Sequence, residues 1–157
     1  MGKANRTPVG GALTGVVLDL FRCNSLLLTA GDRLVAPLGL TSARWQVLGA
    51  IVAAERPQPV AWLARDMGGN RQNVQRIIND LESDGLVAFG TNPHHRRAHL
   101  IALTSKGRQA YEAAMRLQTP WINGLASGIS VKDVETLRRV IATLRENLEN
   151  SGASEKD

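Results

Sequence analysis

The segment from residue 59 to residue 107 restricts the possible fold of this chain more than any other stretch. Its apolar residues recur at helical spacing in residues 60–67 and again in residues 70–84, with Gly68-Gly69 between them as a tight turn. Two runs typical of short strands follow, at residues 86–89 and 98–103, and the residues that join them are turn formers. The order helix, turn, helix, strand, hairpin, strand therefore predicts a mainly α-helical domain that carries a small β-wing.

The hairpin of this segment is strongly cationic. No acidic residue lies between Asp84 and Glu112, and this interval contains Arg96, Arg97, Lys106, Arg108 and all three histidines of the protein. A helix that can enter a major groove, followed by a basic hairpin, is an arrangement that binds duplex DNA. The position of the charge carries more weight than the formal net charge of +5, because many basic proteins bind no nucleic acid.

The composition limits the alternatives. A length of 157 residues suits one domain with dimerising extensions, and 43% hydrophobic residues are enough for a core. Aromatic residues make up only 4%, which disfavours a single-strand binder that stacks bases on exposed rings. The histidines are confined to the hairpin region, and the sequence contains no Gly-rich phosphate loop and no nucleophile with an evident base partner. We therefore expect neither an enzyme nor a cofactor.

Cys23 is the only cysteine, so the chain has no intrachain disulfide and no cysteine-rich zinc site. Its apolar neighbours favour a buried structural thiol over a redox switch. The N-terminal residues lack the long apolar region of a signal peptide, and no run approaches 18 consecutive apolar residues. The sequence therefore predicts a soluble, cytoplasmic protein without a membrane span.

Long helices are predicted on both sides of the central segment. Apolar residues at three- and four-residue steps indicate one helix over about residues 12–37, and Thr41 or Ser42 begins the next. Thr104 begins another long helix, which we expect to end near Pro120. The last helix starts at Ser130 and carries a narrow apolar stripe, formed by Val134, Leu137, Ile141, Leu144 and Leu148.

The terminal helices favour an intermolecular helical bundle, because an apolar stripe at the end of a small domain must pack against another surface. The alternative is that both helices pack on their own domain. The predicted organisation is a disordered N-terminus at residues 1–10, an N-terminal dimerisation helix at 11–38, a DNA-binding lobe at 41–107, C-terminal dimerisation helices at 108–150 and a disordered tail at 151–157.

The helix at residues 70–84 has the side chains needed to read bases. Its apolar residues cluster on one side, so the opposite side presents Gln72, Gln75, Arg76 and Asn79. Gln and Asn can pair with adenine and Arg with guanine through two hydrogen bonds, and each such pair gives about 1–3 kcal/mol of discrimination. Asn70 is a good N-cap, and the free N–H groups at the helix start can receive a phosphate. The alternative is a solvated polar face without a ligand.

Arg96 and Arg97 at the hairpin are predicted to lie along the DNA backbone or to enter a narrow minor groove. His94, His95 and His99 raise the question of a metal site, but no cysteine or carboxylate is near them in sequence, and His99 lies past the turn. We expect no metal. The favoured role of these histidines is contact with phosphate that changes with pH where histidine titrates.

Three segments in combination resemble the MarR family of bacterial regulators. They read LGLTSARWQVLGAI, LARDMGGNRQNVQRIINDLESDGLV and NPHHRRAHLIALTSKG, within a resemblance that covers roughly residues 12–148. Each segment alone is a weak signal, whereas the combination is specific. The resemblance implies a winged helix-turn-helix domain with dimerisation helices from both termini, which acts as a homodimer on double-stranded DNA.

The resemblance also implies roles for single residues. Asn70 lies where the family usually has a capping Ser, Arg76 matches a frequent Arg of its recognition helix, and Arg97 matches its wing Arg. The family commonly has Asp where this chain has His95, so the carboxylate that would orient a wing Arg is missing. The predicted DNA contacts are Asn70, Arg71, Gln72, Asn73, Gln75, Arg76, Asn79, His95, Arg96 and Arg97.

In the family, a small phenolic or lipophilic effector commonly binds between the dimer helices and the DNA-binding lobe and releases the DNA. Trp45 and Leu27 are the residues predicted to line such a pocket, with ordinary core packing as the alternative for Trp45. A peroxide-sensing branch of the family has a reactive Cys near the start of its first helix, with tyrosine partners. That branch fits poorly, because Cys23 lies late in the helix and Tyr111 is the only tyrosine.

The sequence thus predicts a sequence-specific transcriptional regulator, a repressor that binds a palindromic operator as a homodimer and is released by a small molecule. One alternative is a non-specific architectural DNA-binding protein, which the Gln- and Asn-rich helix face disfavours. A second alternative is a protein-interaction module, which the cationic wing disfavours.

Overall fold

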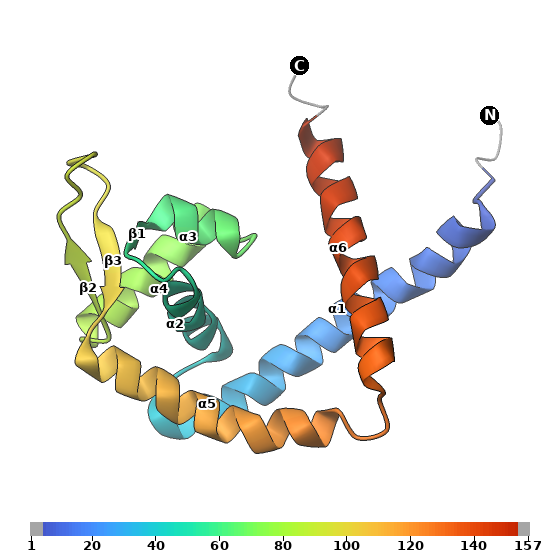
Figure 1. Cartoon of the computed structure of the whole chain (residues 1–157), viewed down its shortest axis with the longest axis horizontal. Helices are drawn as coiled ribbons and strands as arrows, with labels where there is room; N and C mark the ends of the chain where they lie inside the picture. Colours follow the sequence, from blue (N-terminus) through green and yellow to red (C-terminus); the bar gives the residue numbers. More distant parts are fainter. Residues whose placement is uncertain (1–4, 154–157) are drawn as a thin grey trace. The chain divides into compact units, whose positions relative to one another are not determined.

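The computed structural model describes residues 5–153 and consists mainly of helices. The helices are α1 (Pro8–Val35), the 3-10 helix η1 (Ala36–Leu38), α2 (Ser42–Ala53), α3 (Val60–Asp66), α4 (Arg71–Ser83), α5 (Ser105–Leu125) and α6 (Val131–Ala153). The strands are β1 (Gln58–Pro59), β2 (Val87–Gly90) and β3 (Leu100–Leu103). The predicted fold class, mainly α-helical with a small β-wing, is confirmed (Figure 1).

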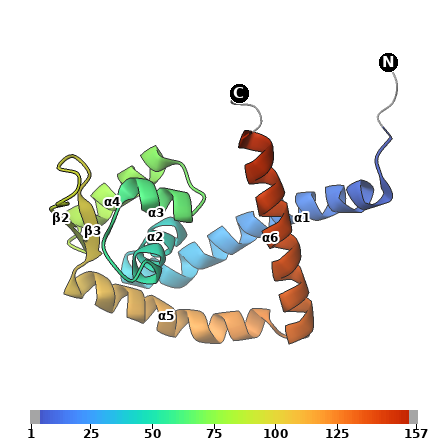
Figure 2. The same ribbon diagram turned by 45° about the horizontal axis from the view of Figure 1, so that its top comes forward.

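The chain divides between Gln118 and Thr119 into two compact units. The first unit contains α1 to α4, the three strands and the beginning of α5. The second unit contains the end of α5 and all of α6. In the first unit, the β2–β3 hairpin lies beside α4, as two views of the molecule show (Figures 1 and 2).

The sheet is antiparallel, with β3 in the centre between β1 and β2. Val87 pairs with Leu103 and Phe89 with Ile101, and on the other side of β3 Gln58 also pairs with Ile101. The sequence predicted only a turn at residues 56–59, because a strand of two residues that includes a proline shows no alternation and lacks one N–H donor. Residues 58–59 therefore form the strand β1 because they pair with β3, and not because their own sequence has the alternation of a strand.

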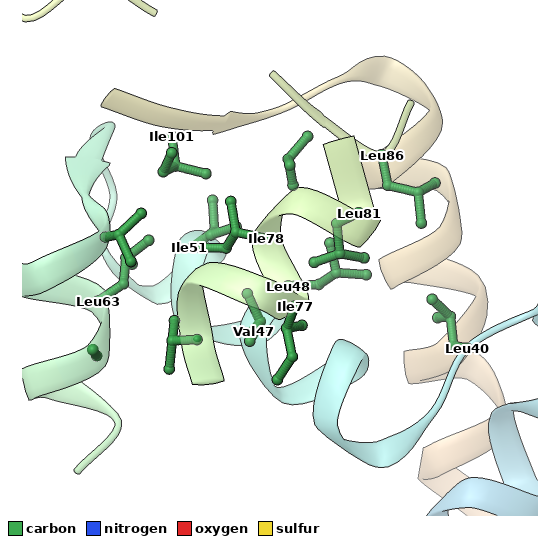
Figure 3. Close-up of a cluster of buried hydrophobic side chains, with 14 of the residues drawn as sticks. Leu40, Val47, Leu48, Ile51, Leu63, Ile77, Ile78, Leu81, Leu86 and Ile101 are labelled. Carbon is green, nitrogen blue, oxygen red and sulfur yellow. The ribbon is translucent and has the colours of Figure 1, made fainter. Parts of the chain in front are cut away.

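The core lies where α2, α3, α4 and the sheet meet (Figure 3). Its largest fully buried side chains are Leu48, Leu63, Ile78, Leu81, Ile101, Val35, Val47 and Val87. Removing such side chains from water is the main stabilising contribution to a small domain. Because α4 buries only one side in this cluster, its opposite side stays available for a ligand.

Side chains at the helix starts fix where the helices begin. The side chain of Asn70 accepts hydrogen bonds from the backbone N–H groups of Gln72 and Asn73 at 2.8 and 3.2 Å, and Thr41 accepts one from Arg44 at 3.2 Å. The hydroxyl of Thr104 accepts one from the N–H of Gly107 at 3.0 Å. These three N-caps agree with the prediction from the sequence.

Two predicted boundaries are wrong. Helix α1 begins at Pro8, so residues 8–10 are helical and not disordered, because the Thr7 hydroxyl caps the helix by accepting from the N–H of Gly10 at 3.0 Å. At the other end α6 continues to Ala153, past the predicted boundary at residue 150. The rest of the two predicted disordered segments, residues 1–4 and 154–157, lies outside the described residues.

Helix α5 does not end near Pro120 as predicted, but continues to Leu125. Proline removes one backbone donor from the helix and crowds the preceding turn, yet its fixed φ is compatible with helical geometry. The backbone keeps its helical conformation on both sides of Pro120. Gly128, with a φ of 80°, lies in the turn that follows α5.

Helix α1 is exposed all round over most of its length and carries many apolar residues. Its exposed large apolar residues are Val9, Val16, Leu18, Leu20, Phe21, Leu26, Leu27 and Leu28. Cys23 is also exposed, so the predicted buried thiol is wrong, because the rest of the first unit leaves all residues of α1 from 18 to 29 exposed. An exposed apolar patch of this extent is typical of an interaction surface.

The stretch Pro8–Leu38 is long and apolar enough to cross a membrane by length and composition, since an 18-residue window within it has a mean hydropathy of 1.4. A single such helix is weak evidence for a membrane span, because helices that pack against protein can have the same composition.

Candidate nucleic-acid interface

Helix α4 separates its apolar and polar residues onto opposite sides. Val74, Ile77, Ile78 and Leu81 are buried in the core. The residues predicted to contact DNA lie outside the core: Arg71, Gln72, Asn73, Arg76 and Asn79 are exposed and Gln75 is half-buried. The helix therefore presents a polar face of amides and guanidinium groups, the donor and acceptor types that recognise base edges.

Asn70 has a structural role at the start of this helix. Its side-chain oxygen is engaged by two backbone N–H groups, and Gly68 makes the preceding turn with a left-handed φ of 65°. These bonds satisfy donors that the helix cannot pair internally. Asn70 thus fixes the position from which the polar face of α4 begins.

Neighbouring polar side chains of α4 bind one another. The Gln75 amide donates from Nε2 to Oδ1 of Asn79 at 2.9 Å, and Arg76 donates from Nη2 to Oδ1 of Asn73 at 3.0 Å. Nη1 of Arg76 also lies 3.6 Å from Oδ2 of Asp80. These contacts hold the long side chains along the helix while no other partner is bound.

The wing loop between β2 and β3 carries the predicted cationic contacts. Asn92 shapes the loop, since its side chain accepts from the N–H of His94 at 3.0 Å and its carbonyl accepts from the N–H of His95 at 3.2 Å. His95, Arg96 and Arg97 are exposed. Within residues 5–153 neither arginine has a carboxylate partner, so both guanidinium groups are available to phosphate.

A hollow of about 490 Å³ lies between α4 and the wing. Arg71, Gln75 and Asn79 line it from α4, and Arg97 and His99 line it from the wing. The structure thus brings together predicted contacts that are far apart in sequence. Gln72, Asn73 and Arg76 do not line this hollow and lie elsewhere on the exposed part of α4, whereas Arg96 lines a second hollow of about 520 Å³ at the wing.

Phe89 is a wall residue of the first hollow that the sequence did not indicate. Its ring lies 5.9 Å from that of His99, centroid to centroid, with an angle of 58° between the planes. Tilted aromatic pairs of this kind stabilise adjacent strands. The signal was weak because Phe89 has the spacing of a core residue, two positions after the buried Val87.

The three histidines do not form a metal-binding cluster. Among the described residues, no three His, Cys, Asp or Glu side chains lie close enough to hold a metal ion. His99 lines both wing hollows, whereas His94 and His95 are exposed in the loop. Their positions fit contact with a polyanion better than a shared ligand.

The two residues predicted to line an effector pocket lie in different environments. Trp45 is half-buried and packs against the core of the first unit, whereas Leu27 is one of the exposed apolar residues of α1. Neither lines the hollow between α4 and the wing.

Comparison with known proteins agrees with this geometry. The MarR family model matches residues 38–98, which include α2, α3, α4 and most of the wing. An uncharacterized protein of Mycobacterium tuberculosis is 36% identical over 134 residues, 83% of this chain and 92% of that protein. The transcriptional activatory protein BadR of Rhodopseudomonas palustris is 31% identical over 135 residues, 82% of this chain and 75% of that protein.

A solved structure extends the similarity to a protein bound to DNA. The transcriptional repressor CouR, bound to a 23-mer DNA duplex, superimposes with a TM-score of 0.74 and 26% sequence identity. The match covers 90% of this chain and 99% of that chain.

Proposed function

Because the chain belongs to the MarR family, whose members are DNA-binding transcription regulators and not enzymes, we propose that it recognises one sequence of double-stranded DNA as a homodimer. The observation that carries this proposal is the hollow between α4 and the wing, where polar side chains of α4 face Arg97. The proposed base-reading groups and the proposed backbone-binding cation then share one surface, which supports sequence-specific recognition.

We assign different roles to the two parts of this surface, α4 and the wing. The proposed contacts with base edges in a major groove are Gln72, Gln75, Arg76 and Asn79 of α4, because amide and guanidinium groups distinguish adenine and guanine. Arg96 and Arg97 of the wing contact phosphate, or a narrow minor groove whose negative potential attracts them. Base contacts then determine which DNA sequence is bound, and phosphate contacts supply affinity and fix the register of the protein on the duplex.

A second copy of the chain is the proposed partner of the exposed apolar residues of α1 and α6. On α6 these residues are Val131, Val134, Leu137, Val140, Ile141 and Leu148. A symmetric dimer that covers them carries two α4 helices, so its operator is a palindrome with half-sites about 34–36 Å apart. Binding both half-sites gives more affinity and specificity than one lobe alone supplies.

We propose that the dimer is cytoplasmic and represses transcription, and that a small phenolic or lipophilic effector releases it from its operator. A dimer that covers a promoter excludes the polymerase, and CouR of the same fold is a transcriptional repressor. BadR is an activatory protein, and the sign of regulation depends on where the operator lies relative to the promoter. Trp45 and Leu27 remain the proposed effector contacts.

Selection of bound sequences from a random duplex pool at near-physiological salt tests the proposal. Recovery of one palindrome is expected. No enrichment, together with binding that weakens steeply with salt, would instead support a non-specific architectural protein, because phosphate contacts would then supply nearly all the affinity.

Three variants test the division of work. Arg97→Ala should weaken binding to all sequences and reduce the slope of log affinity against log salt by about 1. Gln72→Ala and Arg76→Ala should change the preferred bases, with about 1–3 kcal/mol lost at one operator position. Equal losses on operator and random DNA for all three variants would contradict this assignment.

A further inference from the structure

The C-terminal end of α4 is held by side chains from other elements. Asp84, the C-cap residue, pairs through its carboxylate with the guanidinium group of Arg44 from α2. The backbone carbonyl of Asp84 accepts a hydrogen bond from Nζ of Lys106 at the start of α5, at 2.8 Å. We call Arg44, Asp84 and Lys106 the α4 anchor.

The position of Asp84 runs against the local preference of a helix. The C-terminal end of a helix carries partial negative charge, which repels a carboxylate and attracts cations. Arg44 and Lys106 supply cations at this end and offset the repulsion. The acidic residue is therefore explained by its partners on α2 and α5 and not by the helix that it ends.

Arg44 connects the anchor to the turn that follows η1. Its Nη1 donates to the carbonyl of Gly39 at 3.1 Å, and its side chain is only 19% exposed. Its Nε is buried and, among the described residues, has no hydrogen-bond partner. An ion pair between a mostly buried guanidinium group and an exposed carboxylate adds little net stability, but its directional bonds define one relative geometry.

We propose that Arg44 and Asp84 are positioning residues for sequence-specific DNA binding. Their pair fixes α4 against α2, so that the amides and Arg76 of the polar face meet the base edges of one groove in register. A small displacement of α4 costs base contacts, which depend on two-bond geometry, more than phosphate contacts, which depend mainly on charge. This inference rests on the function proposed above.

A double-mutant cycle tests the inference. Asp84→Asn, Arg44→Gln and the double variant are each measured on the selected operator duplex and on a random-sequence duplex of equal length. The ratio of the two affinities should fall about two- to thirtyfold in each single variant, the range typical of residues that modulate a site without touching its ligand. The double variant should lose no more than the single variants, because one interaction is removed in all three.

The pair Arg65 and Asp66 of α3 is the matched control. Asp66 is 51% exposed and Asp84 54% exposed, and Arg65 lies 3.9 Å from Asp66 in an exposed contact. Asp66→Asn and Arg65→Gln change the net charge of the same lobe by the same amounts. They should shift affinity for both duplexes equally and leave the ratio unchanged.

The outcomes are distinguishable. An unchanged ratio in the anchor variants overturns the inference, even if their melting temperatures fall, because the pair would then serve stability alone. An equal fall of the ratio in the control variants, or additive losses in the double variant, also overturns it. Failure of the wild-type protein to select any sequence overturns the proposed function and the inference together, whereas selection with an unchanged ratio overturns only the inference.

Discussion

Replacing Gly107 by alanine should destabilise the DNA-binding lobe through a single backbone contact. Gly107 lies in the first turn of α5, against the backbone of Leu86 that leads into β2. A Cβ atom at this position would lie 1.8 Å from the carbonyl oxygen of Leu86 and 2.8 Å from its carbonyl carbon. The clash is with main chain and not with a movable side chain, so a change of rotamer cannot relieve it.

The expected loss of stability depends on the backbone groups that the new Cβ atom displaces. The carbonyl oxygen of Leu86 accepts from the N–H of Thr104 at 3.1 Å, and the N–H of Leu86 donates to Leu81 at 2.8 Å. Forced overpacking costs about 1–3 kcal/mol, and weakening a buried backbone hydrogen bond adds about 1–3 kcal/mol. The higher helix propensity of alanine returns about 0.5–1 kcal/mol. We therefore expect a net loss of about 3 kcal/mol, a lowering of the melting temperature by about 6–12 °C for a chain of this size.

Thermal unfolding followed by circular dichroism measures this loss. Gly49→Ala is the matched control, because its Cβ would meet only Cε2 of Tyr111 at 3.6 Å, an ordinary contact in the same lobe. This variant should be more stable than wild type by about 0.5–1 kcal/mol. If Gly107→Ala melts within about 2 °C of wild type, the close approach of α5 to Leu86 described above is wrong.

Three further substitutions test other contacts. Asn70→Ala removes the acceptor of two helix-start N–H groups and should lower the free energy of unfolding in urea by about 1 kcal/mol. Asn70→Ser should keep most of the wild-type stability. Equal stability of the wild type and both variants would refute the capping role. Ser42→Ala removes a buried hydroxyl that donates to the Leu28 carbonyl at 2.8 Å and should cost about 1 kcal/mol, while Thr29→Ala, which removes an exposed hydroxyl bond on α1, should cost nothing. Phe21→Asp replaces a 68% exposed apolar side chain of α1 with a charge and should give monomers in sedimentation; a dimer that persists at the same concentration would exclude this position of α1 from the interface.

Local signals in the sequence predicted the parts of the fold that local chemistry determines. The caps at Asn70 and Thr104, the left-handed Gly85 with its φ of 74° and the two-sided character of α4 depend on residues within a few positions of one another. The polar face of α4 was therefore predictable, and with it most of the proposed base contacts.

The features that sequence reasoning missed depend on distant partners. The strand β1 forms because Gln58 and Pro59 meet β3, more than forty residues later in the chain. The exposure of Cys23 depends on how little of α1 the first unit covers. Phe89 enters the hollow through the register of β2 with β3, and Arg44 of α2 pairs with Asp84, which lies forty residues later at the end of α4. The spacing of residues along the sequence does not reveal these partners.

The hydrogen bonds that the polar face of α4 makes with itself have a thermodynamic consequence. Gln75 already has Asn79 as a partner and Arg76 already has Asn73, so binding to a base exchanges one hydrogen bond for another. A cognate base offers two well-directed bonds and a net gain, whereas an ill-matched base offers less than the bond that must be given up. On unrelated sequences we therefore expect these side chains to keep their internal partners and the protein to be held by its cations alone. Its residence on such DNA should be brief and governed by salt, while release from the cognate site must wait for several exchanged bonds to reverse together.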